Sequence, residues 1–201
     1  MAADELRRAL ERLERELARA ALSPGAREAL RDLRAVLPEP LPREVERKYL
    51  LARAPRPPAG LEAETLEIEQ GWLPGERLRE RLRRVRGPAG ERFERALKVG
   101  RGVERIEVEE PLDAATFELL WPATAGCRVH KRRTRVAQDG LVWELDEFLD
   151  RPLWLAEVEL ADAAQHPAPP AWLAACIERE VTDESGWTNL ELARAADRRP
   201  R

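Results

Sequence analysis

The sequence has few cysteines, histidines and tyrosines: two, two and one among 201 residues. Cys127 and Cys176 match no metal or redox spacing, and two thiols do not predict a disulfide-stapled secreted domain. No apolar run approaches the length that spans a membrane, and the first residues are charged and helix-forming, unlike the apolar core of a signal peptide. These absences argue against a disulfide scaffold and a membrane anchor, and we expect a soluble, cytoplasmic protein.

An excess of charge of one sign is also missing. The formal net charge is -3, so the overall balance does not favour nucleic acid as a partner. Charge of both signs is abundant instead, because charged residues make up 36% of the chain against about 25% in an average protein. Arginine far outnumbers lysine, and its planar guanidinium group is the better partner for phosphate. A length of 201 residues allows one domain with an appendage, or two small domains.

The first forty residues have the apolar period of helices. Leucines recur at spacings of four and three residues over 3–20, which predicts an amphipathic helix. Ser23-Pro24 begins a second helix, with serine as the N-cap, and a proline-rich linker ends it. We expect a helical hairpin that covers the domain or mediates self-association. The predicted organisation is an N-terminal helical extension (1–40), a main domain (42–194) and a frayed tail (195–201).

From residue 43 onward the apolar period changes to two, which predicts β-strands separated by tight turns such as Asp139-Gly140. The predicted strands are 43–51, 65–73, 77–86, 91–99, 103–110, 129–136, 141–148 and 153–160. Short helices are predicted from the N-cap Asp113 to Trp121, from Trp172 to Ile177, and at the end of the stretch 182–192.

Nearly every predicted strand has one apolar and one charged face, because alternate side chains of a strand point the same way. Carboxylates dominate the first, seventh and eighth strands, and cationic groups dominate the third, fourth and sixth. The second strand, with Glu67, Glu69 and Gln70, is ambiguous in its facing. The charged faces carry Glu44, Glu46, Lys48, Arg79, Arg81, Lys98, Arg105, Glu107, Glu109, Lys131, Arg133, Glu144, Asp146, Glu157 and Glu159.

Two architectures fit these faces. In a sandwich the apolar faces form the core and the charged faces meet water. In a barrel of about eight strands, which is wide enough for one small ligand, the charged faces line the interior and helices cover the apolar exterior. The predicted helices need an apolar partner, which favours the barrel. So many ionised groups inside a protein are unfavourable unless they pair or bind ions. We therefore predict an anion with divalent cations as the content of the barrel.

The motifs, taken in order, resemble those of the CYTH proteins, the triphosphate tunnel metalloenzymes. Glu44-Val45-Glu46-Arg47-Lys48 resembles their E-x-E-x-K signature, although this signature by itself also fits a solvated edge strand. The resemblance covers about residues 42–194 and excludes the N-terminal helices. The later landmarks are Gln70-Gly71-Trp72-Leu73, the run around Arg79 and Arg81, Leu97-Lys98-Val99-Gly100, Arg105 to Glu109, Lys131-Arg132-Arg133, Trp143 to Phe148, Leu155 to Leu160, and Arg179 to Thr182 followed by Asn189-Leu190.

The resemblance implies an α+β fold with an eight-stranded antiparallel β-barrel, the triphosphate tunnel, that binds Mg²⁺ or Mn²⁺. By matching positions, it implies that the metal sites are Glu44, Glu46, Asp146, Glu157 and Glu159. It likewise implies that phosphate is bound by Lys48, Arg79, Arg81, Lys98, Lys131, Arg133 and Arg179. To these we add Arg105 as a phosphate contact and Glu107, Glu109 and Glu144 as further interior acids. We expect Glu44, Glu46 and Lys48 to be catalytic.

The implied activity is metal-dependent hydrolysis of a triphosphate compound, with inorganic tripolyphosphate or a related organic triphosphate as the small-molecule partner. A class IV-type adenylate cyclase is an alternative, although the His-Phe pair of the cyclases is replaced by Pro42-Arg43. A non-catalytic polyphosphate- or nucleotide-binding module is an alternative of another class. We expect no nucleic acid or membrane partner, and a homodimer through the N-terminal helices or the barrel surface is an open assembly.

Overall fold

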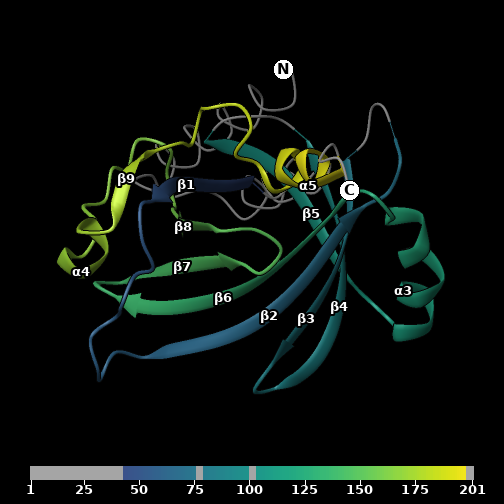
Figure 1. Cartoon of the computed structure of the whole chain (residues 1–201), viewed down its shortest axis with the longest axis horizontal. Helices are drawn as coiled ribbons and strands as arrows, with labels where there is room; N and C mark the ends of the chain where they lie inside the picture. Colours follow the sequence, from purple (N-terminus) through teal and green to yellow (C-terminus); the bar gives the residue numbers. More distant parts are fainter. Residues whose placement is uncertain (1–42, 76–78, 100–102, 198–201) are drawn as a thin grey trace, which may run out of the picture. The chain divides into compact units, whose positions relative to one another are not determined.

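The computed structural model describes residues 43–75, 79–99 and 103–197, and the predicted N-terminal helical extension lies outside them (Figure 1). Within these residues one antiparallel sheet is accompanied by a few short helices. The strands are β1 (Arg43–Leu51), β2 (Ala63–Trp72), β3 (Arg79–Gly87), β4 (Gly90–Val99), β5 (Glu104–Leu112), β6 (Arg128–Gln138), β7 (Leu141–Phe148), β8 (Leu153–Glu159) and β9 (Ile177–Glu180). The helices are α3 (Ala114–Leu120), a 3-10 turn (Trp121–Thr124), α4 (Ala171–Ala174) and α5 (Asn189–Asp197), which runs into the predicted tail.

The eight predicted strands are confirmed close to their predicted bounds, but eight was too few. The helix predicted from Trp172 to Ile177 is wrong in its second half, because α4 ends at Ala174 and β9 begins at Ile177. β9 is only four residues long and has a single apolar residue, so its sequence carries no alternating pattern. It forms because its backbone pairs with the end of β1, at Tyr49, Leu50 and Leu51.

The strand order is β5-β4-β3-β2-β6-β7-β8-β1-β9, and β5 also pairs with β1. β1 therefore has three neighbouring strands. Its first residues pair with β5, its centre and end pair with β8, and its end also pairs with β9. The coarse prediction of an antiparallel α+β fold is confirmed, and the closed barrel stays a prediction at this point.

Local sequence explains the hairpins that join neighbouring strands. Asp139 and Gly140, between β6 and β7, have φ angles of 53° and 76°. Two successive left-handed residues are typical of the type I′ turn, which matches the twist of the flanking strands. The predicted N-cap is also confirmed, because the backbone N–H of Thr116 donates to Asp113 Oδ1 at 2.8 Å at the start of α3.

The register decides which way β2 faces. Leu66, Ile68, Gln70 and Trp72 are buried, whereas Glu67 is exposed and Glu69 half-buried. Residues directly opposite in an antiparallel pair lie on the same face of the sheet. Gln70 lies opposite Arg83 and Trp72 opposite Arg81, so the charged face of β3 continues onto Gln70 and Trp72.

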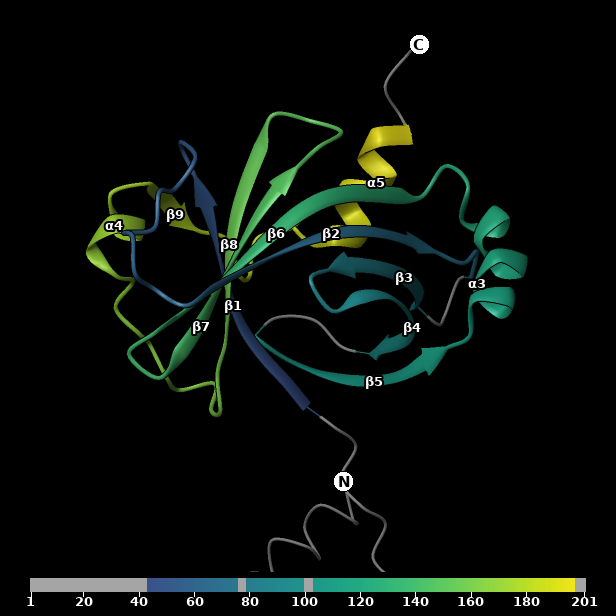
Figure 2. The same cartoon turned by 90° about the horizontal axis from the view of Figure 1, so that it is seen from below.

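The two faces of the sheet carry separate apolar clusters. One contains Val45, Tyr49 and Trp143, and Leu173 of α4 packs against it. The other contains Leu50, Phe148 and Leu155 together with Leu190, Leu192 and Ala193 of α5. Leu50 shares its face with Lys48 and Glu46, so α5 packs at one end of the charged face. Figure 2 shows α4 with β9 at one side of the sheet and α3 at the other.

Among the described residues, no helix has the length and apolar character required to cross a bilayer. The cytoplasmic location and the homodimer stay predictions.

Candidate active site

A cavity of about 440 Å³ lies against the charged faces of the strands. It brings together predicted site residues that are far apart in the sequence, because the strands that carry them are neighbours in the sheet. The predicted residues that line it are Glu44, Glu46, Lys48, Arg79, Arg81, Arg133, Glu144, Glu157 and Glu159.

The acidic wall of the cavity is built by β1 and β8. Glu46 lies opposite Glu159, and Lys48 opposite Glu157. Lys48 Nζ stands 2.8 Å from Glu157 Oε1 and 3.4 Å from Glu46 Oε1. Burial, followed by the nearby carboxylates of Glu44 and Glu144, raises the pKa of Glu159. Several carboxylates therefore lie close together at this end of the wall.

A buried ion-pair network joins β6, β7 and β8 next to this wall. Asp146, which has no exposed surface, accepts hydrogen bonds from Lys131 Nζ at 2.5 Å and from Arg133 Nε and Nη2 at 2.7 Å. Arg133 also pairs with Glu144, and its Nη2 stands 2.5 Å from Glu157 Oε2. Lys131 and Asp146 do not line the cavity themselves but connect to it through Arg133.

The network shifts the pKa values of its members in opposite directions. Burial, and then the neighbouring Arg133, lowers the pKa of Lys131 to about 8, although Asp146 opposes this change. Burial disfavours ionisation of Glu157, but Lys48, Arg133 and Lys131 outweigh it and hold the pKa of Glu157 well below its usual range. Glu157 is therefore an ionised carboxylate that pairs with Lys48 and Arg133.

The basic wall is built mainly by β3. Arg81 is 3% exposed, and its Nη2 donates to Glu107 at 3.0 Å and to Glu109 at 2.7 Å. Burial, followed by the neighbouring Arg83, lowers the pKa of Arg81 to about 10, so Arg81 is still a cation at neutral pH. The backbone register places Lys98 opposite Arg79 and Glu107, and Arg105 opposite Glu44.

The structure does not bring Arg179 to the cavity. This residue lies on β9 with an exposed side chain, 3.1 Å from Glu184 and 2.7 Å from Glu178, and over the ring of Trp187. Its predicted role in phosphate binding stays a prediction.

Sequence reasoning missed the part of the cavity that is formed by Trp72, Arg83 and the segment 182–191. The backbone N–H of Lys48 donates to Thr182 Oγ1 at 3.0 Å, and Lys48 Nζ donates to the carbonyl of Trp187 at 3.4 Å. Thr188 and Glu191 exchange hydrogen bonds at the start of α5. Their T-x-x-E spacing is a capping box, a signal that would have located the start of this helix.

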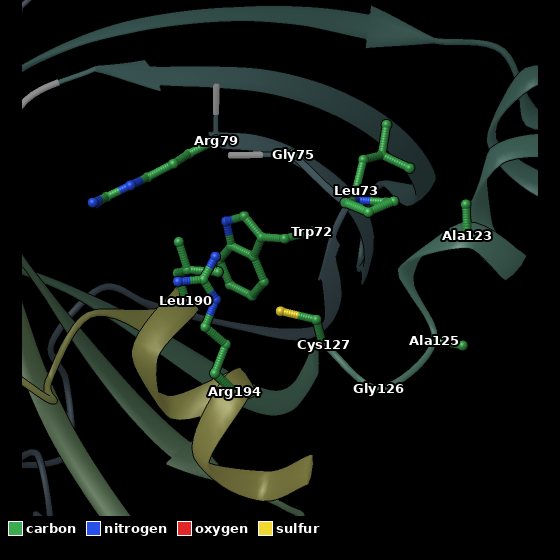
Figure 3. A pocket seen from close by; sticks show the side chains of 11 residues that line it. Trp72, Leu73, Gly75, Arg79, Ala123, Ala125, Gly126, Cys127, Leu190 and Arg194 are labelled. Atoms are coloured by element: carbon green, nitrogen blue, oxygen red, sulfur yellow. The ribbon is translucent and has the colours of Figure 1, made fainter. Parts of the chain in front are cut away.

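A second cavity, of about 360 Å³, adjoins the first and shares Trp72, Arg79 and Leu190 with it. Figure 3 shows the indole of Trp72 between Arg79 of β3 and the side chains of Leu190 and Arg194 of α5. Cys127 also lines this cavity.

Comparisons with known proteins agree with this arrangement. No family profile matches the chain. An inorganic triphosphatase of Nitrosomonas europaea is 38% identical over 157 residues, which are 75% of this chain and 96% of the relative. A crystal structure of an inorganic triphosphatase matches with a TM-score of 0.53 at 36% identity, over 75% of this chain and 94% of that one. A crystal structure described as a hypothetical protein matches with the same TM-score at 37% identity, over 75% and 97%. With such identity over nearly the whole relative, the chain belongs to the CYTH family, the triphosphate tunnel metalloenzymes.

Proposed function

We propose that the protein hydrolyses a phosphoanhydride bond of a triphosphate compound, with inorganic tripolyphosphate as the substrate. One observation carries this proposal: a single cavity has arginines on one wall and carboxylates on the other. A chain of linked phosphates needs cationic groups along its length, and its hydrolysis needs charge neutralisation and alignment. The similarity to an inorganic triphosphatase supports the choice of substrate.

We further propose that β1 to β8 close into a tunnel around this cavity. The pairing of β5 with β1 supports closure, because β5 is the first strand of the sheet order and β1 is adjacent to β8. A closed interior would shield the bound phosphates from water and strengthen each ionic contact.

A divalent cation, Mg²⁺ or Mn²⁺, fits the acidic wall. Among the described residues no three histidine, cysteine or carboxylate side chains converge as a ready-made metal site. Mg²⁺ does not require one, because it is commonly held by one or two carboxylates together with substrate phosphates and water. Glu44, Glu46, Glu157 and Glu159 line the cavity on this wall, and we propose Glu44, Glu46 and Glu159 as the ligands. The bound ion supplies charge neutralisation on the phosphoryl oxygens.

The side chains of the chain divide the remaining work. Arg79, Arg81 and Arg133 bind phosphoryl oxygens, where a guanidinium group can donate two parallel hydrogen bonds. Lys48 lines the cavity from the acidic wall, and it stabilises the leaving phosphate. Asp146 and Glu157, predicted as metal ligands from the sequence, pair with Lys131, Arg133 and Lys48, and we propose that they hold these cations in position.

The test is phosphate release by the full chain from tripolyphosphate, thiamine triphosphate, ATP and long polyphosphate, with Mg²⁺, with Mn²⁺ and with EDTA. We expect fastest release from tripolyphosphate and none in EDTA. Cyclic AMP and pyrophosphate from ATP would replace hydrolysis by a cyclase activity. Tight binding of tripolyphosphate without turnover in either metal would instead indicate a binding module.

A further inference from the structure

Gln70 is a buried amide on the charged face of β2. Its side chain has no exposed surface, and in the register it lies directly opposite Arg83 of β3. Trp72, two residues further on the same face, lines the cavity, as do Arg81 and Arg83. Gln70 itself does not line it, so its carboxamide is buried next to the cavity wall without being part of it.

Neither Nε2 nor Oε1 of Gln70 has a hydrogen-bond partner in the part of the chain that the structure describes. The same holds, among those residues, for the buried Nε atoms of Arg81 and Arg83. Buried amides in proteins are nearly always paired, and an unpaired one destabilises the fold. The unpaired groups on β2 and β3 therefore call for a physical reason.

The chemistry of these groups indicates what would complete them. A carboxamide has two N–H donors and one acceptor oxygen, and each arginine Nε adds one donor. Donors outnumber acceptors, so the complement is a group that only accepts, such as a phosphoryl oxygen. Side chains directly opposite in antiparallel strands have Cβ atoms about 5 Å apart, so Gln70 and Arg83 can reach one phosphoryl group together.

Arg83 is held loosely enough to take part. Its Nη1 stands 3.3 Å from Glu94 and 3.8 Å from Glu109, longer than the usual ion pair of about 2.8 Å. An anion in the cavity offers this guanidinium a stronger partner, and a movement of Arg83 toward it would change the surroundings of Gln70, its partner in the register.

We propose that Gln70 is a substrate-binding residue: when the triphosphate binds, Arg83 turns onto a phosphoryl group and Gln70 Nε2 donates a hydrogen bond to it beside Arg81 Nε. This assignment rests on the proposed function. It gives Gln70, in the stretch Gln70-Gly71-Trp72-Leu73, a role in substrate binding that the sequence analysis did not predict.

The test variant is Gln70→Met, which keeps the size of the side chain and removes its donors. We expect its affinity for tripolyphosphate, measured by titration calorimetry in EDTA, and its kcat/KM with Mg²⁺ to fall about ten- to hundredfold, as for one lost hydrogen bond to a charged group. We expect its Tm without ligand to be unchanged or higher, because an unpaired buried amide is removed. The matched control is Glu69→Gln, on the adjacent outward position, where binding should not change.

Wild-type affinity and kcat/KM in Gln70→Met would overturn the assignment and leave Gln70 as a structural residue only. If Gln70→Met does not fold, Gln70→Glu is the second test variant. Its carboxylate can pair with the arginines, so we expect this variant to fold and to lose tripolyphosphate binding. Binding within twofold of wild type would overturn the assignment. If the wild-type chain neither binds nor hydrolyses tripolyphosphate, the proposed function fails first, and the assignment fails with it.

Discussion

Neutralising Asp146 should destabilise the fold far more than neutralising its neighbour Glu147. Asp146 is fully buried and accepts hydrogen bonds from Lys131 and, twice, from Arg133. In Asp146→Asn the ammonium of Lys131 stays buried without the carboxylate that accepts from it. Breaking one side of a buried ion pair destabilises by about 3–5 kcal/mol. For a chain of this length, each kcal/mol lowers the Tm by about 2–4 °C, so we expect a fall of about 6–20 °C.

The control lies one residue away on the opposite face of β7. Glu147 pairs with Arg132 at 2.8 Å, and both side chains are partly exposed. Exposed pairs contribute about 1 kcal/mol or less, so Glu147→Gln should lower the Tm by only a few degrees. Both variants are unfolded by heat and by urea in EDTA, so that metal binding does not contribute. Equal losses of stability in the two variants would refute the buried network as a determinant of stability.

The difference in stability between the wild type and Asp146→Asn should also depend on pH. Asp146 is one of the groups that raise the pKa of Lys131, so its loss moves that pKa below about 8. A lysine whose pKa is lower in the folded than in the unfolded state adds stability as pH rises through the folded value, because the unfolded state then binds more protons. The variant begins this gain at a lower pH than the wild type. Its deficit in the free energy of unfolding should therefore shrink as the pH rises toward about 8, and a constant deficit would contradict the assignment to Lys131.

Three further outcomes follow from other parts of the structure. Glu159→Gln removes a negative charge close to Glu44, Glu46 and Glu144, so the metal-free protein should gain thermal stability. Its Mg²⁺-dependent phosphate release should fall by more than about tenfold. An unchanged rate would show that Glu159 is not part of the metal site. Gly71→Ala would bring a Cβ within 2.5 Å of Thr124 Oγ1, so urea unfolding should show a loss of about 1–3 kcal/mol, and wild-type stability would contradict this close approach. Asp113→Ala removes the N-cap of α3 and should lower the free energy of unfolding slightly, with tripolyphosphate hydrolysis unchanged. A change in kcat would link α3 to the site.

The sequence by itself determined where the strands lie and which of their faces are charged. Both depend on local chemistry: the alternation of apolar and charged residues selects an extended backbone, and Asp139-Gly140 adopts the left-handed angles of a tight turn. The order of the motifs was enough to identify the family. These properties need no knowledge of which strand is beside which.

Only the tertiary structure decided which charges meet. Glu46 faces Glu159, and Asp146 faces Arg133, because the strand register sets these pairs. The facing of Gln70 and the formation of β9 were likewise decided by neighbouring strands, since neither stretch has an alternating pattern strong enough to choose. The pairing of Arg179 with Leu50 is set by β9 in the same way. Pairing between strands depends on backbone hydrogen bonds over long sequence separations, and the period of a single strand contains no record of its partner.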